Sequence, residues 1–233
     1  MSQYEKAWQA VRARIAAAAN AAGRDPAAIS LVAVSKTFPA AAVRDVHALG
    51  QRAFGENYVQ EAAAKRAALA DLPDIDWRLI GPLQSNKTAL AVVTFDAVET
   101  VDRPQIAVRL STQRSVDRPP LDVLVQVNIS GEATKSGVAP DQALALAREV
   151  HVLPRLRLRG YMGIAAASAD AAVQRAQFGA LREILEATRA AGLPVDTLSM
   201  GMTADLDAAI AAGATEVRVG SAIFGARAAG NAG

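Results

Sequence analysis

The sequence predicts an α/β protein built as a single (β/α)8 barrel of the TIM type. Short apolar segments alternate with helical stretches about eight times along the chain, and this repetition is typical of a parallel barrel. No Gly-x-Gly-x-x-Gly motif follows the first apolar segment, and only a short apolar stub, 222–229, follows the last. Both features favour the barrel over a doubly wound open sheet, which is the alternative. The 233 residues, 52% of them hydrophobic, suffice for one domain spanning 1–233.

The expected elements follow one another as strand, helix, strand. We expect strands over 29–35, 52–55, 77–81, 97–100, 121–127, 156–162, 197–200 and 216–219. We expect helices over 40–49, 58–70, 86–93, 104–114, 140–152, 171–191 and 204–212. Three of these helices end at a helix-stopping glycine, namely Gly50, Gly192 and Gly213. An extra N-terminal helix over 3–22 would add cover to the barrel.

Composition and charge exclude several classes of function. The 25 basic residues are scattered among 23 acidic ones, and with few aromatic residues the chain is not expected to bind nucleic acid. The absence of cysteine excludes disulfides, thiolate nucleophiles and Cys-ligated zinc, and two histidines make a metal site improbable. The N-terminus is charged from residue 5, and no apolar segment has the length that a bilayer requires. We therefore expect a cytoplasmic protein without a membrane or metal partner.

A lysine stands at the end of the first predicted strand, in the stretch LVAVSKTFPA. Strand side chains alternate, so Val32, Val34 and Lys36 share one face, and valines that fill the barrel interior would place the lysine at its C-terminal mouth. Barrel enzymes keep their active sites at that mouth. A desolvated lysine there can offer a free amine to a carbonyl and form a Schiff base. The alternative is a lysine that extends from the strand end into water.

Two segments near the end of the chain have the composition of a phosphate site. LSMGMTADLDAAIAAG contains Ser199, Gly201 and Thr203, and EVRVGSAIFG contains Gly220 and Ser221, each set between a strand and a helix. Small residues let the backbone approach a phosphate, and hydroxyl and backbone N–H groups donate to it. The loops after the seventh and eighth strands are the recurrent phosphate site of barrels. Together with a lysine at the mouth, they indicate a ligand with an aldehyde and a phosphate, and pyridoxal phosphate has both.

Arg218 lies between Val217 and Val219 in the last strand, and the pattern leaves its direction open. It could point outward and pair with a carboxylate such as Glu216. It could instead point into the barrel, where its guanidinium would donate to the pyridine nitrogen of the cofactor. A pyridine nitrogen held unprotonated is a poor electron sink, so carbanion chemistry would be weakly supported.

Five sequence blocks carry a resemblance to a known family. AVSKTFP, FGENYVQE, WRLIGPLQSNK, VNISGEATKSG and LSMGMTADLDAAIAAGATEVRVGSAIFG resemble the signature blocks of the pyridoxal phosphate homeostasis protein family, in the expected order over 29–225. The resemblance implies a barrel like the N-terminal domain of alanine racemase, with pyridoxal phosphate bound as a Schiff base. It also implies a role in vitamin B6 and in amino and keto acid balance, with apoenzymes as possible recipients of the cofactor and no established catalytic reaction.

The resemblance also assigns the residues of a cofactor site. It makes Lys36 the Schiff-base lysine, places Asn57 beside the cofactor and turns Arg218 inward toward the pyridine nitrogen. The residues that it places around the phosphate are Ser199, Gly201, Met202, Thr203, Gly220 and Ser221.

Some positions depart from the family pattern or have no assigned role. Arg78 stands where the family often has histidine, Tyr161 where it usually has leucine, and Thr203 where serine is common. The first departure leaves no imidazole at that site, and the last retains a hydroxyl. Lys135 matches a family block, but its chemistry predicts only a surface loop lysine.

Two enzyme classes remain as alternatives to a carrier of the cofactor. A racemase needs an acid and a base on opposite faces of the substrate, and alanine racemases supply a tyrosine across a dimer and add a β-rich domain. The chain has only Tyr4, Tyr58 and Tyr161, and it is expected to end soon after the eighth strand, as a monomer. A Schiff-base aldolase acting on a sugar phosphate is also compatible with a mouth lysine beside a phosphate site.

Overall fold

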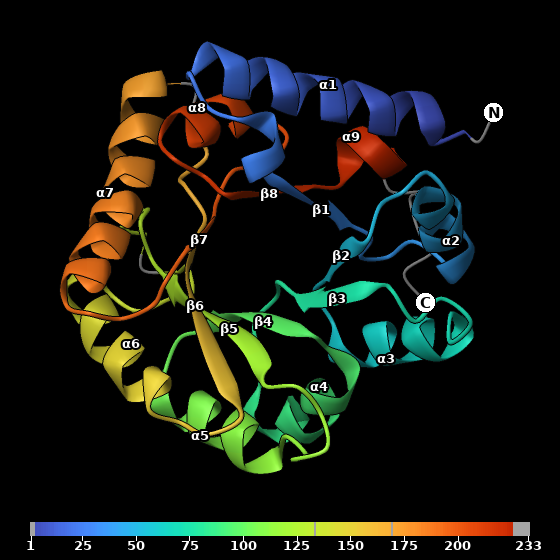
Figure 1. Ribbon diagram of the computed structural model, residues 1–233. Helices are drawn as coiled ribbons and strands as arrows, with labels where there is room; N and C mark the ends of the chain where they lie inside the picture. The colour runs from blue at the N-terminus through green and yellow to red at the C-terminus, as the bar shows by residue number, and fades with distance from the viewer. Residues whose placement is uncertain (1–2, 133, 169, 226–233) are drawn as a thin grey trace.

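Eight parallel strands close into a barrel in the computed structural model, which describes residues 3–132, 134–168 and 170–225. Figure 1 views the barrel from the N-terminal ends of these strands. The strands are β1 (Ser30–Val34), β2 (Ala53–Glu56), β3 (Asp76–Leu79), β4 (Ala97–Val101), β5 (Leu121–Val127), β6 (Leu156–Gly163), β7 (Thr197–Ser199) and β8 (Glu216–Val219). Each predicted strand is present, and closure of the sheet rules out the doubly wound alternative.

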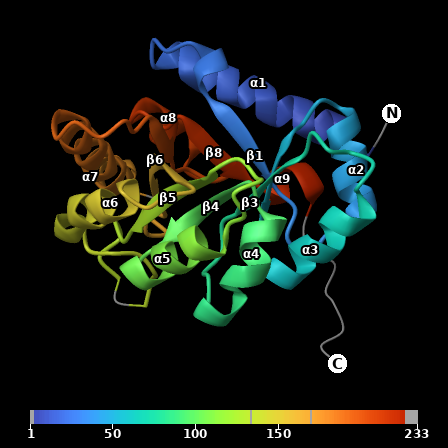
Figure 2. The ribbon, with the colours of Figure 1, turned by 60° about the horizontal axis from the view of Figure 1, so that its bottom comes forward.

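Helices surround the barrel on its outer side (Figures 1 and 2). The α-helices are α1 (Glu5–Ala21), α2 (Ala40–Ala48), α3 (Val59–Ala68), α4 (Thr88–Thr94), α5 (Pro104–Gln113), α6 (Ala143–His151), α7 (Ala171–Ala190), α8 (Leu206–Ala211) and α9 (Ser221–Phe224). Short 3-10 turns are η1 (Pro26–Ala28), η2 (Ser85–Lys87) and η3 (Pro140–Gln142). The predicted helices over 86–93 and 140–152 each begin with such a turn. Residues 226–229 of the predicted apolar stub lie outside the described residues.

The expected extra helix covers one side of the barrel. α1 lies across α8 and α9 on the outer surface, and it contacts both (Figures 1 and 2). Its buried residues are Val11, Ile15 and Ala19, spaced by four residues so that they form one face of the helix. This face supplies the apolar contact that holds α1 against the barrel.

Pairing between β1 and β8 completes the barrel and sets which residues face its interior. Ser30 pairs with Glu216 and Val32 with Arg218. Because strand side chains alternate, Glu216 and Arg218 share the inner face of β8, whereas Val217 and Val219 face the helices. The interior is strongly polar for a closed barrel, since Glu99, Ser199, Glu216 and Arg218 are all buried there. These polar groups need partners, and their pairing shapes the floor of the site.

Two absences hold for the described part of the chain. None of its helices has the length and apolar character needed to cross a membrane. Within the same residues, no cluster of histidine, aspartate or glutamate side chains has the arrangement of a metal site.

Candidate functional site

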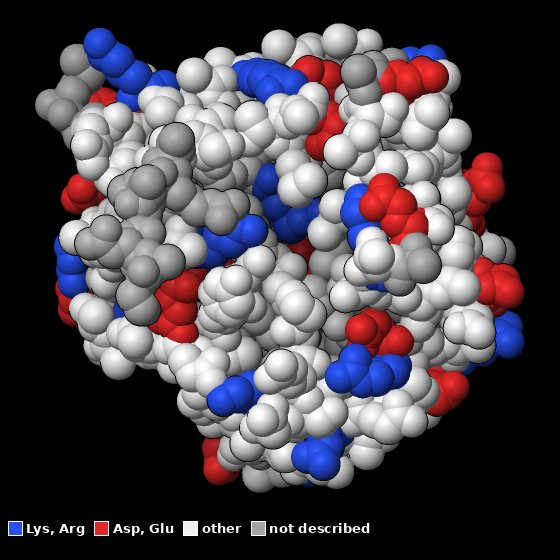
Figure 3. Space-filling view, turned by 180° about the vertical axis from the view of Figure 1, so that it is seen from behind, with Lys and Arg blue, Asp and Glu red and all other residues white. Residues whose placement is uncertain are grey.

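A cavity of about 400 Å³ lies at the C-terminal mouth of the barrel. The residues that line it are Val34, Lys36, Phe38, Asn57, Ile80, Ile164, Met202, Thr203, Ala204, Arg218, Gly220, Ser221 and Gly225. Figure 3 views this face, which is hollowed near its centre and has basic side chains in the hollow. Lys36 and Arg218 are the basic residues among the described lining residues, and none of those residues is acidic, so the lining is electropositive.

Lys36 is the second residue after β1, and its half-buried side chain lines the cavity as the strand alternation predicts. The next residue, Thr37, has a φ of 68°. This left-handed conformation is unfavourable for a β-branched residue, so surrounding contacts must hold the turn in place. The backbone N–H of Thr37 donates to Glu61 Oε1 at 2.6 Å, which is one such contact.

A buried ion-pair network lies beneath this turn. Lys65 Nζ donates to the carbonyl oxygen of Ser35, to Glu56 Oε1 and to Glu61 Oε1, each at 2.7 Å. Ser35 Oγ also donates to Glu56 Oε1 at 2.6 Å. Burial raises the pKa of Glu56, and the nearby Lys65 ammonium opposes that rise. Lys65 therefore links both residues that flank Lys36, Ser35 directly and Thr37 through Glu61.

Sequence reasoning missed this network, although part of it lies in a block that carries the resemblance. Glu56 and Glu61 belong to FGENYVQE, and Lys65 follows Glu61 by one helical turn. An i, i+4 acidic–basic pair is usually read as a solvated surface pair. The burial of Lys65, which is 5% exposed, depends on α3 packing over the end of β1 and cannot be read from spacing alone.

Arg218 forms the floor of the cavity and points into the barrel. Its Nη1 donates to Ser199 Oγ at 2.7 Å, and its Nη2 donates to the carbonyl oxygen of Gly163 at 3.0 Å. The side chain is 4% exposed. The outward alternative is therefore excluded, and Glu216 pairs instead with Arg78.

Four cofactor-site residues were predicted at the end of β7 and in the loop after it, and two of them line the cavity. Met202 and Thr203 line it, but Ser199 and Gly201 do not. Ser199 is fully buried below the cavity, where its hydroxyl accepts from Arg218 and donates to Glu99 Oε2 at 2.6 Å. A Cβ at Gly201, where φ is 94°, would lie 2.5 Å from Ala209 Cβ. These two residues position the loop and the arginine rather than contact the cavity.

The same loop is fixed from both sides. Asp205 Oδ1 accepts from the backbone N–H of Met202 at 2.6 Å, so this aspartate closes the loop, and α8 begins one residue later. From α1, Arg14 Nη1 donates to the carbonyl oxygen of Thr203 at 2.6 Å, and the same guanidinium pairs with Asp207. The predicted helix over 204–212 therefore begins later than expected, at Leu206.

Three uncommitted polar groups surround the cavity. The hydroxyls of Thr203 and Ser221 and the side-chain amide of Asn57 line it, and none of them makes a hydrogen bond within the described residues. Gly81 lets Asn57 approach closely, because a Cβ at position 81 would lie 2.4 Å from the Asn57 carbonyl oxygen. Gly220 fits in a similar way, with its hypothetical Cβ 3.1 Å from the carbonyl oxygen of Val34. The cavity thus offers donors that the fold itself does not use.

Two of the three family departures, Arg78 and Tyr161, lie away from this cavity, whereas Thr203 lines it. Arg78 is at the opposite end of the barrel and pairs with Asp76 and Glu216. Tyr161 faces the helices, where its buried hydroxyl lies 2.6 Å from Thr188 Oγ1. Burial raises the pKa of this phenol. Neither side chain reaches the lining of the mouth cavity.

Lys135 lines an adjoining cavity of about 220 Å³, which shares Asn57, Ile80 and Ile164 with the first. Its ammonium lies 3.3 Å from the carbonyl oxygen of Ala165 and 3.3 Å from Glu132. The side chain is partly exposed, as expected of a loop lysine.

Comparison with known proteins gives the family. The model of the alanine racemase N-terminal domain matches residues 7–228. A pyridoxal phosphate homeostasis protein of Pseudomonas aeruginosa is 58% identical over 217 residues, which cover 93% of each chain. That of Escherichia coli K12 is 49% identical, covering 93% of this chain and 94% of its own. PipY of Synechococcus elongatus PCC7942, solved with PLP bound, is 37% identical with a TM-score of 0.82, and the match covers 96% of this chain and all of PipY. The chain belongs to the family of pyridoxal phosphate homeostasis proteins, which share the alanine racemase N-terminal barrel.

Proposed function

We propose that this protein binds pyridoxal 5'-phosphate in the mouth cavity and carries it as a Schiff base on Lys36. In this role it contributes to vitamin B6 homeostasis and to the balance of amino and keto acids, without catalytic turnover of its own. The observation that supports this most directly is that Lys36 and Arg218 line one cavity together with hydroxyls that make no hydrogen bonds within the described chain.

The groups around the cavity match the chemistry of the cofactor. When bound, the cofactor supplies an aldehyde for imine formation and a ring able to accept electrons. A half-buried lysine amine suits the aldehyde. The hydroxyls of Thr203 and Ser221, beside the small residue Gly220, suit a phosphate. Met202 and Asn57 would contact the remainder of the ligand. Of the residues predicted to surround the phosphate, Ser199 and Gly201 are assigned a supporting role.

Arg218 sets the electronic character of the site. A guanidinium has donors but no acceptor, and it remains charged at any ordinary pH. At the floor of the cavity it favours an acceptor such as an unprotonated ring nitrogen. That preference weakens the ring as an electron sink, which is one reason to propose a carrier rather than an enzyme.

A second reason is the lack of an opposing acid. Tyr4 packs edge-on against Phe224, Tyr58 is exposed on the surface, and Tyr161 faces the helices. Among the described residues that line the cavity, none is a tyrosine or a histidine. Lys36 can serve one face of a substrate, and racemisation needs both.

The cellular setting follows from the same proposal. A carrier must release its cofactor, and apoenzymes that depend on pyridoxal phosphate are the recipients that we propose. We also propose that the protein acts in the cytoplasm as a single-domain monomer.

Borohydride reduction tests the proposed linkage. Visible absorbance of the purified protein should reveal the bound cofactor, and reduction should fix it to the peptide that contains Lys36, as mapped by mass spectrometry. Lys36→Ala should lose that absorbance while retaining weak non-covalent binding. Lys135→Ala, which alters a lysine in the adjoining cavity, is the matched control. A label that persists in Lys36→Ala would assign the linkage to another lysine, and a colourless wild type that takes up no cofactor would reject the function.

Deuterium exchange at Cα tests the absence of turnover. Alanine and other amino acids in heavy water should exchange no faster with the loaded protein than with free cofactor. Exchange well above that level, lost in Lys36→Ala and accompanied by loss of optical activity, would establish the racemase instead.

A further inference from the structure

A directional hydrogen-bonded chain runs down the barrel from the floor of the mouth cavity. Arg218 donates to Ser199 Oγ at 2.7 Å, and Ser199 Oγ donates in turn to Glu99 Oε2 at 2.6 Å. Ser199 and Glu99 are both fully buried. Because the Ser199 proton is directed at Glu99 Oε2, that oxygen acts as an acceptor, and any proton on this carboxyl belongs on Oε1.

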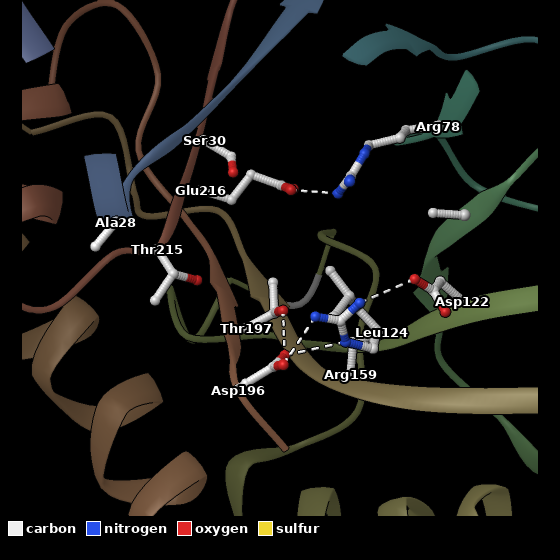
Figure 4. A pocket seen from close by; sticks show the side chains of 11 residues that line it. Ala28, Ser30, Arg78, Asp122, Leu124, Arg159, Asp196, Thr197, Thr215 and Glu216 are labelled. Atoms are coloured by element: carbon white, nitrogen blue, oxygen red, sulfur yellow. Dashed lines mark hydrogen bonds and ion pairs between the residues drawn. The ribbon is translucent and has the colours of Figure 1, made fainter. Parts of the chain in front are cut away.

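A second cavity lies beyond the end of this hydrogen-bonded chain, at the N-terminal end of the barrel. This cavity of about 290 Å³ is lined by Arg78 and Glu216 together with Asp122, Arg159 and Asp196. Figure 4 shows Arg78 reaching Glu216, while Arg159 pairs with Asp122 and Asp196. The Arg78 guanidinium donates to Glu216 Oε2, so this oxygen also acts as an acceptor. Arg78 pairs in addition with Asp76 at 2.7 Å.

Two buried oxygens between these ends have no donor. Oε1 of Glu99 and Oε1 of Glu216 make no hydrogen bond with any described residue. Arg78 Nη1 lies 3.8 Å from Glu99 Oε1, too far for a hydrogen bond. The same Arg78 Nη1 pairs with Glu216, so the two glutamate carboxyl groups are neighbours. Two neighbouring carboxylates repel, whereas a single proton on Glu99 Oε1, shared with Glu216, would give both orphaned oxygens a hydrogen bond.

The formal charges of the buried groups around Glu99 and Glu216 sum to zero if these groups hold one such proton. Arg78 and Arg218 supply two positive charges, and Asp76, Glu99 and Glu216 are three carboxyl groups. With one proton the cluster is neutral, and without it a net negative charge is buried in the barrel, at a large desolvation cost. Burial, followed by the charge of Glu216, raises the pKa of Glu99 to about 8. Arg78 from β3 and Arg218 from β8 oppose that rise.

We propose that Glu99 and Glu216 share one proton, and that this pair acts through Ser199 to hold Arg218 in the orientation it presents to the cofactor. Glu99 and Ser199 are thus positioning residues, since neither lines the mouth cavity. The positioning role rests on the proposed function, whereas the shared proton does not. The Glu216 end of the pair borders the N-terminal cavity, so the proton exchanges with solvent at the end of the barrel opposite the cofactor.

Infrared spectroscopy of the cofactor-free protein tests the shared proton. At pH below about 8, a difference spectrum between wild type and Glu99→Gln should contain the carbonyl stretch of a protonated carboxylic acid, lost as the pH rises above that range. Glu56→Gln is the control, because it removes another buried glutamate outside the chain and should leave the band in place. Absence of a band that depends on Glu99 would overturn the proposal, whether or not the protein binds the cofactor.

Cofactor titration tests the positioning role. Glu99→Gln retains an acceptor toward Ser199 and a donor toward Glu216. The visible spectrum should therefore match that of wild type, and the dissociation constant should stay within about twofold of it. Ser199→Ala breaks the chain with a small change in volume, and it should shift the spectrum and weaken retention by about tenfold. Ser30→Ala, an exposed serine at the N-terminal cavity, should change neither property.

These outcomes separate the two proposals. A Ser199→Ala spectrum identical to wild type would overturn the positioning role, and so would a Glu99→Gln variant that shifts as much as Ser199→Ala. A wild type that binds no cofactor would reject the proposed function, and the infrared band would still decide whether the pair shares a proton.

Discussion

The ammonium of Lys65 lies 2.7 Å from the carbonyl oxygen of Ser35, the residue that directly precedes the proposed Schiff-base lysine. The same ammonium contacts Glu56, which is fully buried, and Glu61, which holds the backbone of Thr37. A single buried lysine on α3 thus fixes both neighbours of Lys36.

Lys65→Met should destabilise the fold and loosen the turn that carries Lys36. It leaves Glu56 without its counter-charge, and removing one partner of a buried pair costs about 3 kcal/mol in the free energy of unfolding. Urea unfolding measures this change. Adding Glu56→Gln should recover part of the loss, because the uncompensated carboxylate is then gone. Arg182→Met, which breaks an exposed pair with Glu186, should cost below about 0.5 kcal/mol. Equal effects of Lys65→Met and Arg182→Met would contradict this account.

Thr37→Gly should leave the free energy of unfolding unchanged or raise it by up to about 1 kcal/mol. Glycine adopts the φ of 68° without steric cost, and this gain competes with its greater freedom in the unfolded chain. Thr37→Val retains the β-branch and should show no such gain. Thermal unfolding of the three proteins at one pH is the measurement. A clear loss of stability in Thr37→Gly would mean that the turn is not strained.

Ser221→Ala and Thr203→Val should each weaken cofactor retention by about tenfold. A hydrogen bond to a charged group is worth about 1.5–3 kcal/mol, and neither hydroxyl is committed elsewhere in the described chain. Titration with pyridoxal phosphate gives the dissociation constants, and Lys135→Ala serves as the control. Constants equal to wild type in both variants would show that backbone groups alone hold the phosphate.

The stability of the wild type should fall as pH rises from about 4.5 to about 8 because of Glu99. Its pKa is raised from the ordinary 4.5 to about 8 by burial, so in this window the folded state binds a proton that the unfolded state has released. One proton corresponds to a slope of at most about 1.4 kcal/mol per pH unit. Urea unfolding across this range should give a flatter profile for Glu99→Gln. Parallel profiles for the two proteins would remove Glu99 as the source.

Sequence patterns predicted the barrel because short, largely apolar segments alternate with helical stretches, three of which end at a glycine. They also located Lys36 correctly at the mouth, since the alternation Val32, Val34, Lys36 depends only on strand geometry. Strand alternation alone could not predict the direction of the Arg218 side chain. Glu216 and Arg218 make the inner face of β8 polar, and a polar face of a strand is normally predicted to be the solvent-exposed one. Whether a charged side chain can be buried depends on partners from distant strands, and local periodicity carries no information about those partners.

Two of the residues predicted to surround a phosphate, Ser199 and Gly201, lie outside the cavity and illustrate the same limit. Ser199 has a hydroxyl group of the kind that binds phosphate. At the end of β7, however, this hydroxyl donates to Glu99, which lies one hundred residues earlier in the chain. Gly201 is required by its close approach to Ala209 in α8 rather than by a ligand. Only the packed barrel distinguishes these two residues from Thr203 and Ser221, which line the cavity.

The pairing of Arg78 with Glu216 has a consequence for the order in which the chain folds. These partners are 138 residues apart, and Glu216 lies on the strand that closes the barrel against β1. While a ribosome is still making the chain, Arg78 and Glu99 emerge long before their partners Glu216 and Ser199. An open sheet of the first strands would have to bury these polar groups without those partners, so it has little to gain from early compaction. The barrel can therefore close only once its last strand is available, and until then its future interior stays hydrated.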